Sequence, residues 1–256
     1  MAMNAEDRSN NRLPVVETED EIQVKHCLII NMDSRTDLWE ALNEPRRLMQ
    51  EAGIRVERVP GVDNTYAPNL LKTLYREGIL AFDSAGWRRN SKHLRNELGC
   101  FTAHYNALKR VVQEGWESCL IMEDGVEFLR ADFENLRTNK QIDVKVIHPH
   151  MKNEGWGAQG YVVTEKGAAN MLSILYPLKL PYDLAMRNAL MRRELVYHIH
   201  GPYFMKRNDR RISSIGRDMS ERDLNKKQSL LPLYKRLLDG LMEDPNIDLD
   251  DYLFDA

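Results

Sequence analysis

A continuous apolar run over residues 24–31 constrains the fold of this chain more than any other feature of its sequence. Strands that are apolar at consecutive positions, instead of at alternate ones, are buried on both faces and are typical of parallel sheets. A second run of this kind covers residues 118–122. We therefore expect an α/β fold in which helices cover both faces of a mainly parallel sheet.

The rest of the chain alternates between strand and helix patterns. Apolar residues at helical spacing predict helices over 37–51, 97–114 and 165–176, and shorter apolar segments predict strands over 54–59, 144–147, 157–164 and 196–199. The first strand, helix and second strand form a βαβ unit, which is right-handed in nearly all proteins. Together these patterns predict a Rossmann-like sheet.

The ends of the chain differ in composition from its centre. Residues 1–20 are polar and without periodicity, which predicts a flexible lead-in to a single domain over 21–217. Residues 218–256 predict a helical extension, with a helix over 227–242 and an acidic tail. Residues 230–242 are amphipathic and are expected to pack on the core or on a second subunit, so a homodimer is one expectation.

Charge and hydropathy exclude some classes of partner. The net charge of −3 argues against a general affinity for nucleic acid. No apolar run approaches the roughly 20 residues that cross a bilayer, and the N-terminal residues contain no apolar signal core. Cys27, Cys100 and Cys119 lie in apolar contexts that predict reduced, buried thiols. These features favour a cytoplasmic protein without a transmembrane segment.

The strongest chemical signal is the pair Glu123 and Asp124, directly after the strand at 118–122. In open α/β sheets, ligands bind outside the carboxyl ends of the strands. Carboxylates there hold Mg²⁺ or Mn²⁺, which neutralises a diphosphate. The alternative is an exposed turn whose acidic residues cap a helix.

A polar loop follows the first strand and reaches the same edge of the expected sheet. Asn31 or Asp33 is placed to contact a base or ribose, and Arg35 to contact a phosphate. Helix capping by Asp33 is the alternative.

Histidine and arginine residues add further candidates. His198 and His200 share one face of an expected strand and are candidate metal ligands or bases, with a structural role as the alternative. His104 lies beside the apolar stripe of a helix, where a structural role is again the default. A basic segment is compatible with phosphate binding, with nucleic-acid binding or with a solvated face; it contains Arg187, Arg192, Arg193, Lys206, Arg207, Arg210, Arg211 and Arg217.

Four blocks, in order along the chain, resemble glycosyltransferase family 25. INMDSRTD at 30–37 resembles the family's INLDRRxDR, and the second-strand block beginning at Gly53 ends near Asp63. ELGCFTAH at 97–104 resembles GEIGCxLSH, and LIMEDGV at 120–126 resembles ILEDDV. Segments at 160–163, 167–168 and 181–183 follow in the family's order, so the resemblance extends from about residue 25 to 214.

The resemblance implies a GT-A type fold and an inverting transfer of galactose or glucose from a UDP-sugar. The acceptor would be a hydroxyl of a glycan, as in lipopolysaccharide biosynthesis, or of hydroxylysine. Carried across by position, the donor site would include Asn31, Asp33, Arg35, Asp63 and His104. Glu123 and Asp124 would hold the divalent cation, Asp124 would act in catalysis, and Asp183 would be the base.

This chain departs from the family pattern in three places. Gly125 stands where the family has a second Asp, Thr102-Ala103-His104 replaces LSH, and Leu38 replaces an Arg. One carboxylate is therefore missing where a cation is expected: either Glu123 and Asp124 suffice, with His198 or His200 as a further ligand, or metal dependence is weakened. The missing carboxylate also leaves open a catalytically inactive protein that binds sugar nucleotides.

Overall fold

The computed structural model describes residues 20–62, 76, 91–129, 131–147, 158–177, 182–199 and 205–207. Several predicted features lie outside these residues: the lead-in at 1–19, Asp63, His200 and the extension at 218–256.

Six strands form the central sheet, in the order β3-β2-β4-β8-β7-β9. Their bounds are β2 His26–Met32, β3 Arg55–Gly61, β4 Ser118–Glu123, β7 Val144–Val146, β8 Gly160–Thr164 and β9 Tyr197–Ile199. β8 runs antiparallel to both of its neighbours, β4 and β7, and the remaining pairs are parallel. Five strands therefore share one direction, and the sheet is mixed, with β8 reversed inside it.

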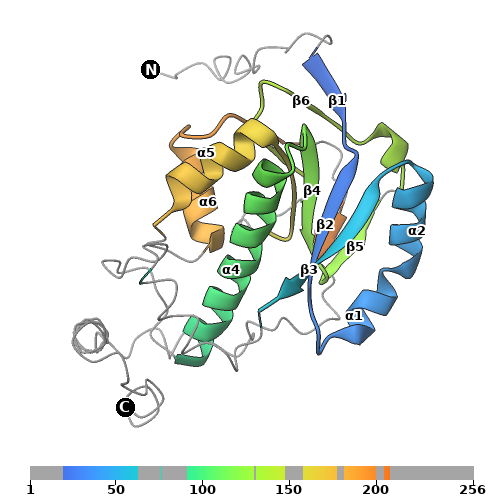
Figure 1. The fold of residues 1–256 in the computed structure, drawn as a ribbon, viewed down its shortest axis with the longest axis horizontal. Helices are drawn as coiled ribbons and strands as arrows, with labels where there is room; N and C mark the ends of the chain where they lie inside the picture. Colours follow the sequence, from blue (N-terminus) through green and yellow to red (C-terminus); the bar gives the residue numbers. More distant parts are fainter. Residues whose placement is uncertain are drawn as a thin grey trace, which may run out of the picture.

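Helices cover both faces of this sheet, as the buried strand pattern predicts (Figure 1). Their bounds are α1 Thr36–Ala41, α2 Asn43–Glu51, α4 Ser91–Gln113, α5 Glu165–Leu175 and α6 Tyr182–Met191. α1 and α2 lie on one side of the sheet, and α4, α5 and α6 lie on the other. Within the described ranges, no helix has the length and apolar character needed to cross a membrane.

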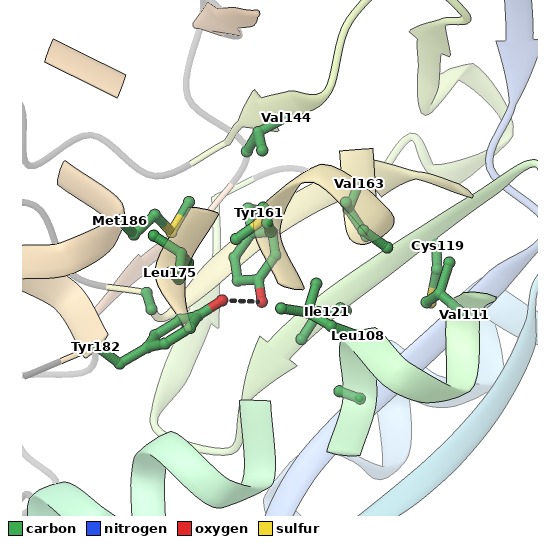
Figure 2. Packing of buried hydrophobic residues seen from close by; sticks show 14 of the residues in the cluster. Leu108, Val111, Cys119, Ile121, Val144, Tyr161, Val163, Leu175, Tyr182 and Met186 are labelled. Atoms are coloured by element: carbon green, nitrogen blue, oxygen red, sulfur yellow. Dashed lines mark hydrogen bonds between the residues drawn. The ribbon is translucent and has the colours of Figure 1, made fainter. Parts of the chain in front are cut away.

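Successive side chains of β4 pack alternately in two separate core clusters, one on each face of the sheet. Cys119 and Ile121 pack in one core cluster with residues of α4, α5 and α6 (Figure 2). Leu120 and Met122 pack in the other cluster, which includes Met49 of α2. Because successive side chains of a strand point to opposite faces, consecutive apolar residues are needed when both faces are covered.

The helix predicted over 37–51 is two helices, α1 and α2, separated at Leu42. Pro45 is the third residue of α2. Proline has no backbone N–H to donate to the carbonyl of Ala41, and its ring would clash with that carbonyl in a continuous helix. The break therefore has a cause that is visible in the sequence, although the apolar spacing alone hides it.

Two pairs of short strands lie outside the central sheet and were not predicted. β1 (Glu21–Gln23) pairs with β6 (Arg137–Asn139), and β5 (Val126–Phe128) pairs with β10 (Met205–Arg207). Segments of three residues are too short to show a period, so only tertiary pairing defines them. The β5–β10 pair brings residues 205–207 beside the turn that follows Asp124.

His26, the first residue of β2, makes the stability of the fold sensitive to mild acid. Its ring stacks on Trp116 with the centroids 4.1 Å apart, and its buried Nδ1 has no hydrogen-bond partner among the described residues. Burial, and then the charge of Arg55, lower the pKa of His26 below its usual 6.5. The unfolded chain therefore binds more protons than the folded chain as the pH falls below 6.5, and stability is lost in that direction.

We expect His26→Phe to retain the ring stack and to reduce this loss. The measurement is the thermal unfolding midpoint of wild type and variant between neutral and mildly acidic pH. The wild-type midpoint should fall more steeply. The variant should keep part of the slope, because burial also lowers the pKa of His198. Equal slopes in the two proteins would contradict a role for His26.

Candidate functional site

The candidate site lies at the carboxyl ends of β2 and β4, which are parallel neighbours. Asp124 follows β4 directly, and its backbone N–H donates to the carbonyl of Ile30 in β2 at 3.0 Å. The loop after β2 and the turn after β4 are thereby tied together. Parallel pairing explains why residues 93 positions apart in the chain, Asn31 and Asp124, come into contact.

Asn31 connects the groups at this edge. Its Nδ2 donates to Oδ2 of Asp124 at 2.7 Å and to the carbonyl of Arg35 at 2.9 Å. Its Oδ1 accepts from Nε of Arg58 at 2.8 Å. An asparagine amide has two N–H donors, and both are used here. Asn31 is also only 2% exposed, so it is placed to position Asp124 and the loop.

Arg58 of β3 belongs to the same group, although no pattern in the sequence singled it out. Its guanidinium pairs with Oδ1 of Asp33 at 2.6 Å and donates to the carbonyl of Asn31 at 3.2 Å. Arg58 lies within the strand expected over 54–59, to which no functional residue was assigned. The signal available in the sequence was its position, one residue before the end of that expected strand.

Burial and a neighbouring charge perturb the Asp124 carboxyl. Burial raises the pKa of Asp124 above its usual value, the hydrogen bond from Asn31 opposes this rise, and the charge of Glu123 adds to it. The charge of Arg35 acts in the opposite direction. The ionised carboxylate is therefore held in an environment that a bound cation would stabilise.

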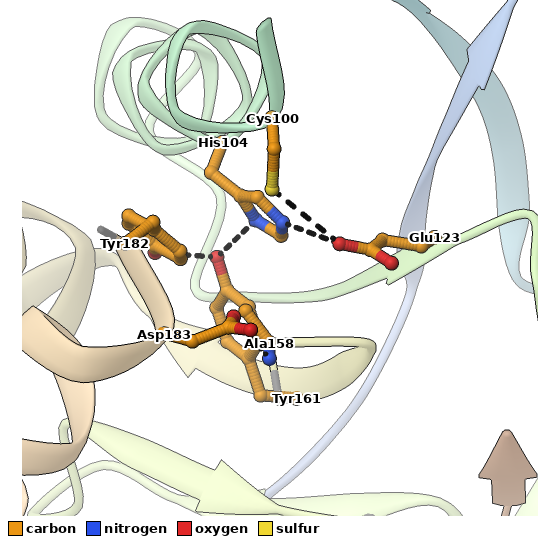
Figure 3. Close-up of polar contacts among 7 residues, drawn as sticks. All are labelled: Cys100, His104, Glu123, Ala158, Tyr161, Tyr182 and Asp183. Carbon is orange, nitrogen blue, oxygen red and sulfur yellow. Dashed lines mark hydrogen bonds and ion pairs between the residues drawn. The ribbon is translucent and has the colours of Figure 1, made fainter. Parts of the chain in front are cut away.

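Glu123 contacts a different group, on the side of α4 (Figure 3). Its Oε1 lies 3.6 Å from Sγ of Cys100 and 3.5 Å from Nε2 of His104. The ligand atoms of Cys100, His104 and Glu123 all lie within 4.8 Å of one another, which makes them a candidate metal cluster. We refer to these three residues as the thiol cluster.

Two tyrosines hold the other side of the His104 ring. Nδ1 of His104 lies 3.1 Å from the Tyr161 hydroxyl, which lies 2.9 Å from the Tyr182 hydroxyl. The Tyr182 ring stacks on the imidazole with the centroids 4.4 Å apart. Burial raises the pKa of Tyr161 and Tyr182 well above the usual tyrosine value, so both hydroxyls stay protonated. His104 is fully buried, and its expected contact with a donor stays a prediction.

Asp183 reaches the same edge of the sheet from the first turn of α6. Its Oδ1 accepts from the backbone N–H of Ala158 at 2.8 Å. The carbonyl of the next residue, Gln159, accepts from the N–H of Glu123 at 2.9 Å. Asp183 is thus linked through two residues to the end of β4, near which a catalytic base was expected.

The structure divides the predicted site residues into two groups. Asn31, Asp33, Arg35 and Asp124 lie together where β2 and β4 end, whereas Glu123 contacts His104 of α4. Asp63 and His200 are outside the described residues, so the predicted ligand set of Glu123, Asp124 and His200 stays a prediction. Cys100 was expected to be buried, like Cys27 and Cys119, but is half-buried. Its spacing of four from His104 on a helix was the signal for the thiol cluster.

Gly125 has room for a larger side chain. A Cβ at this position would meet no atom within 4 Å. Its backbone is also outside the positive-φ region that disfavours other residues. Packing among the described residues therefore does not require a glycine at this position. Compared with the Asp of the resembled ILEDDV block, Gly125 removes a charged group without being needed to relieve a clash.

Comparison with known proteins supports the resemblance seen in the sequence. No family model matches the chain. A glycosyltransferase 25 family member of Anopheles gambiae is 27% identical over 111 residues, which are 43% of this chain and 18% of that protein. A member of the same family from Drosophila pseudoobscura pseudoobscura is 28% identical over 120 residues, or 45% of this chain and 18% of the relative. The matched region thus spans under a fifth of each relative.

Similar solved structures are more distant in sequence. A glycosyltransferase involved in the glycosylation of the major capsid of PBCV-1 has a TM-score of 0.46 and 9% identity, covering 78% of this chain and 97% of that one. A mutant Drosophila β-1,4-galactosyltransferase 7 in complex with manganese, UDP-Gal and xylobiose has a TM-score of 0.41 and 8% identity, covering 80% and 81%. At these scores the two structures carry no conclusion about this chain.

Proposed function

We propose that this chain is a GT-A type glycosyltransferase that moves galactose or glucose from a UDP-sugar to a hydroxyl of a glycan or hydroxylysine, with inversion. The observation that carries the proposal is the Asp124 carboxylate, held by Asn31 at the carboxyl ends of two parallel strands. Sequence similarity to glycosyltransferase 25 family members supports it. We place the catalytic domain at residues 21–217.

The residues at this edge fit a hard divalent cation. Burial and the neighbouring Glu123 both destabilise the ionised form of Asp124, and carboxylate oxygens suit Mg²⁺ or Mn²⁺. A bound cation would neutralise the charge that develops on the leaving diphosphate. Asp124 would hold this cation, and the charge of the preceding residue, Glu123, would lie close to the cation.

The chain's own residues would then perform the remaining steps. Arg35 would bind a phosphate of the donor, while Asn31 and Arg58 keep the loop after β2 in place. Asp183 would accept the proton of the acceptor hydroxyl. As that oxygen forms its bond to the anomeric carbon, the sugar–phosphate bond breaks from the opposite face and UDP leaves.

Release of UDP from UDP-galactose or UDP-glucose tests this function directly. The assay contains the full chain, Mn²⁺ and a panel of hydroxyl acceptors, and UDP is quantified with and without protein. We expect release above background that depends on an acceptor. If no nucleotide sugar is turned over and none raises the thermal unfolding midpoint, the proposal is wrong.

Gly125 favours a second candidate, a protein of the same family type that binds sugar nucleotides without catalysis. A ligand that binds only the folded state raises its stability by mass action. Thermal stabilisation by UDP without any release of UDP from its sugars would select this alternative.

Restoring the family carboxylate should strengthen binding of the hard cation. We expect Gly125→Asp to tighten Mn²⁺ binding by about tenfold, because affinity for hard cations rises with the number of charged oxygen ligands. The empty space around Gly125 lets the side chain enter without a clash. Free Mn²⁺ is measured by electron paramagnetic resonance during titration of the protein.

The isosteric variant Gly125→Asn is the matched control for this change. It adds the same volume without the charge and should leave Mn²⁺ affinity near that of wild type. Equal tightening by both variants would assign the effect to the backbone. No tightening by Gly125→Asp would place the cation away from this turn.

A further inference from the structure

The geometry points to a separate zinc site in the thiol cluster, formed by Sγ of Cys100, Nε2 of His104 and Oε1 of Glu123. This inference does not depend on the proposed transferase activity. It concerns an ion that joins α4 to Glu123 at the end of β4 (Figure 3). Asn31, by contrast, contacts the next residue, Asp124.

The measured separations match those of ligands around one tetrahedral ion. Zinc lies about 2.3 Å from sulfur, about 2.0–2.1 Å from nitrogen and about 2.0–2.2 Å from oxygen. Tetrahedral angles then place sulfur and oxygen about 3.5–3.7 Å apart, and nitrogen and oxygen about 3.3–3.5 Å apart. The observed distances from Oε1 of Glu123 are 3.6 Å to Sγ of Cys100 and 3.5 Å to Nε2 of His104.

A direct hydrogen bond explains the His104–Glu123 contact less well. Such N–H···O bonds are about 2.7–3.2 Å long, and charge-assisted ones are at the short end of that range. The separation of 3.5 Å is longer than this, although His104 is fully buried and held from its other side. Ligands that share an ion are held apart at this larger distance.

The surroundings of His104 supply the support that metal-binding histidines usually have. Such a histidine donates its second ring N–H to a fixed acceptor, which sets the tautomer and the ring orientation. Here Nδ1 lies 3.1 Å from the Tyr161 hydroxyl, and that hydroxyl is held by Tyr182. When Nδ1 donates its proton to Tyr161, Nε2 presents its lone pair toward Cys100 and Glu123.

The donor set selects a thiophilic ion over magnesium or manganese. Sulfur and imidazole nitrogen favour Zn²⁺, whereas hard ions favour oxygen alone. Cys100 is the half-buried cysteine, and full burial raises the pKa of Cys27 and Cys119. On binding, the Cys100 thiol releases its proton to solvent and the thiolate forms the bond to the ion. Three protein ligands leave a fourth tetrahedral position for water or another donor.

Cobalt substitution tests the site without any nucleotide sugar. Co²⁺ bound to a thiolate has a sulfur-to-cobalt charge-transfer absorption in the near ultraviolet, and Zn²⁺ should displace it. We expect the metal-free full chain to develop this absorption on titration with Co²⁺. The Cys100→Ala variant should lose it, and Glu123→Gln should bind at least about tenfold more weakly.

Two further variants separate a metal site from a structural role. Cys119→Ala removes a buried thiol outside the thiol cluster and should keep the absorption. Tyr161→Phe removes only the hydroxyl that orients His104 and should weaken cobalt binding by about 10–100-fold. A wild-type protein without the charge-transfer absorption, or an absorption that survives Cys100→Ala, would overturn the inference. UDP release can succeed or fail independently of either result.

Discussion

Asp124→Asn should reduce sugar transfer by at least about a hundredfold while the protein stays folded. The loss is expected because the carboxylate would hold the cation that stabilises the departing diphosphate, a contribution of several kcal/mol to the barrier. Burial raises the pKa of Asp124, so the folded state is already penalised for carrying this charge. An uncharged amide of the same shape should therefore leave the thermal unfolding midpoint unchanged or raise it.

The measurement is UDP release at saturating donor, with the unfolding midpoint recorded on the same preparation. Asp37→Asn is the matched control, because Asp37 is an exposed carboxylate of the same edge whose ion pair with Arg35 is 3.4 Å long. Exposed ion pairs of this kind contribute little to stability, so Asp37→Asn should keep the wild-type rate of UDP release. Full turnover by Asp124→Asn would remove Asp124 from the mechanism. A large fall in its midpoint would mean that the Asn31–Asp124 contact is mainly structural.

Gly167→Ala should destabilise the fold strongly, and much more than the same substitution at Gly125. Gly167 lies in the first turn of α5, and a Cβ there would lie 1.9 Å from the carbonyl oxygen and 2.5 Å from the carbonyl carbon of Asp143. Both are backbone atoms of the residue directly before β7, so no side-chain rotation relieves the clash. The same carbonyl accepts from the N–H of Thr164, whose hydroxyl caps α5 by accepting from Gly167.

Overpacking of this kind costs about 3 kcal/mol. For a chain of this size the unfolding midpoint should fall by roughly 6–12 °C. Gly125→Ala adds the same methyl group where no atom lies within 4 Å, and its midpoint should change little. Equal midpoints for the two variants would show that α5 can move away from β7, so that the close approach at Gly167 is not required for stability.

Local sequence patterns were sufficient for most of the fold. Consecutive apolar residues in β2 and β4 predicted buried strands with helices on both faces, because a strand has apolar side chains on both sides only when both sides are covered. The run at 157–164 predicted a strand where β8 lies, but not its direction. Nothing in the residues of β8 records that it runs antiparallel between β4 and β7, since strand direction is a property of the connections and of pairing.

The sequence by itself determined which polar groups lie near the strand ends: Asn31, Asp33, Arg35 and Asp124 lie at or shortly after the ends of two strands, and strand ends meet at one edge of a sheet. Only the tertiary structure decided which of these groups contact one another. It joined Asp124 to Asn31, directed Glu123 toward Cys100 and His104, and added Arg58 from a third strand. The physical reason is that adjacent residues at the end of a strand face opposite sides of the sheet, and the partners on each side come from distant segments that only folding brings together.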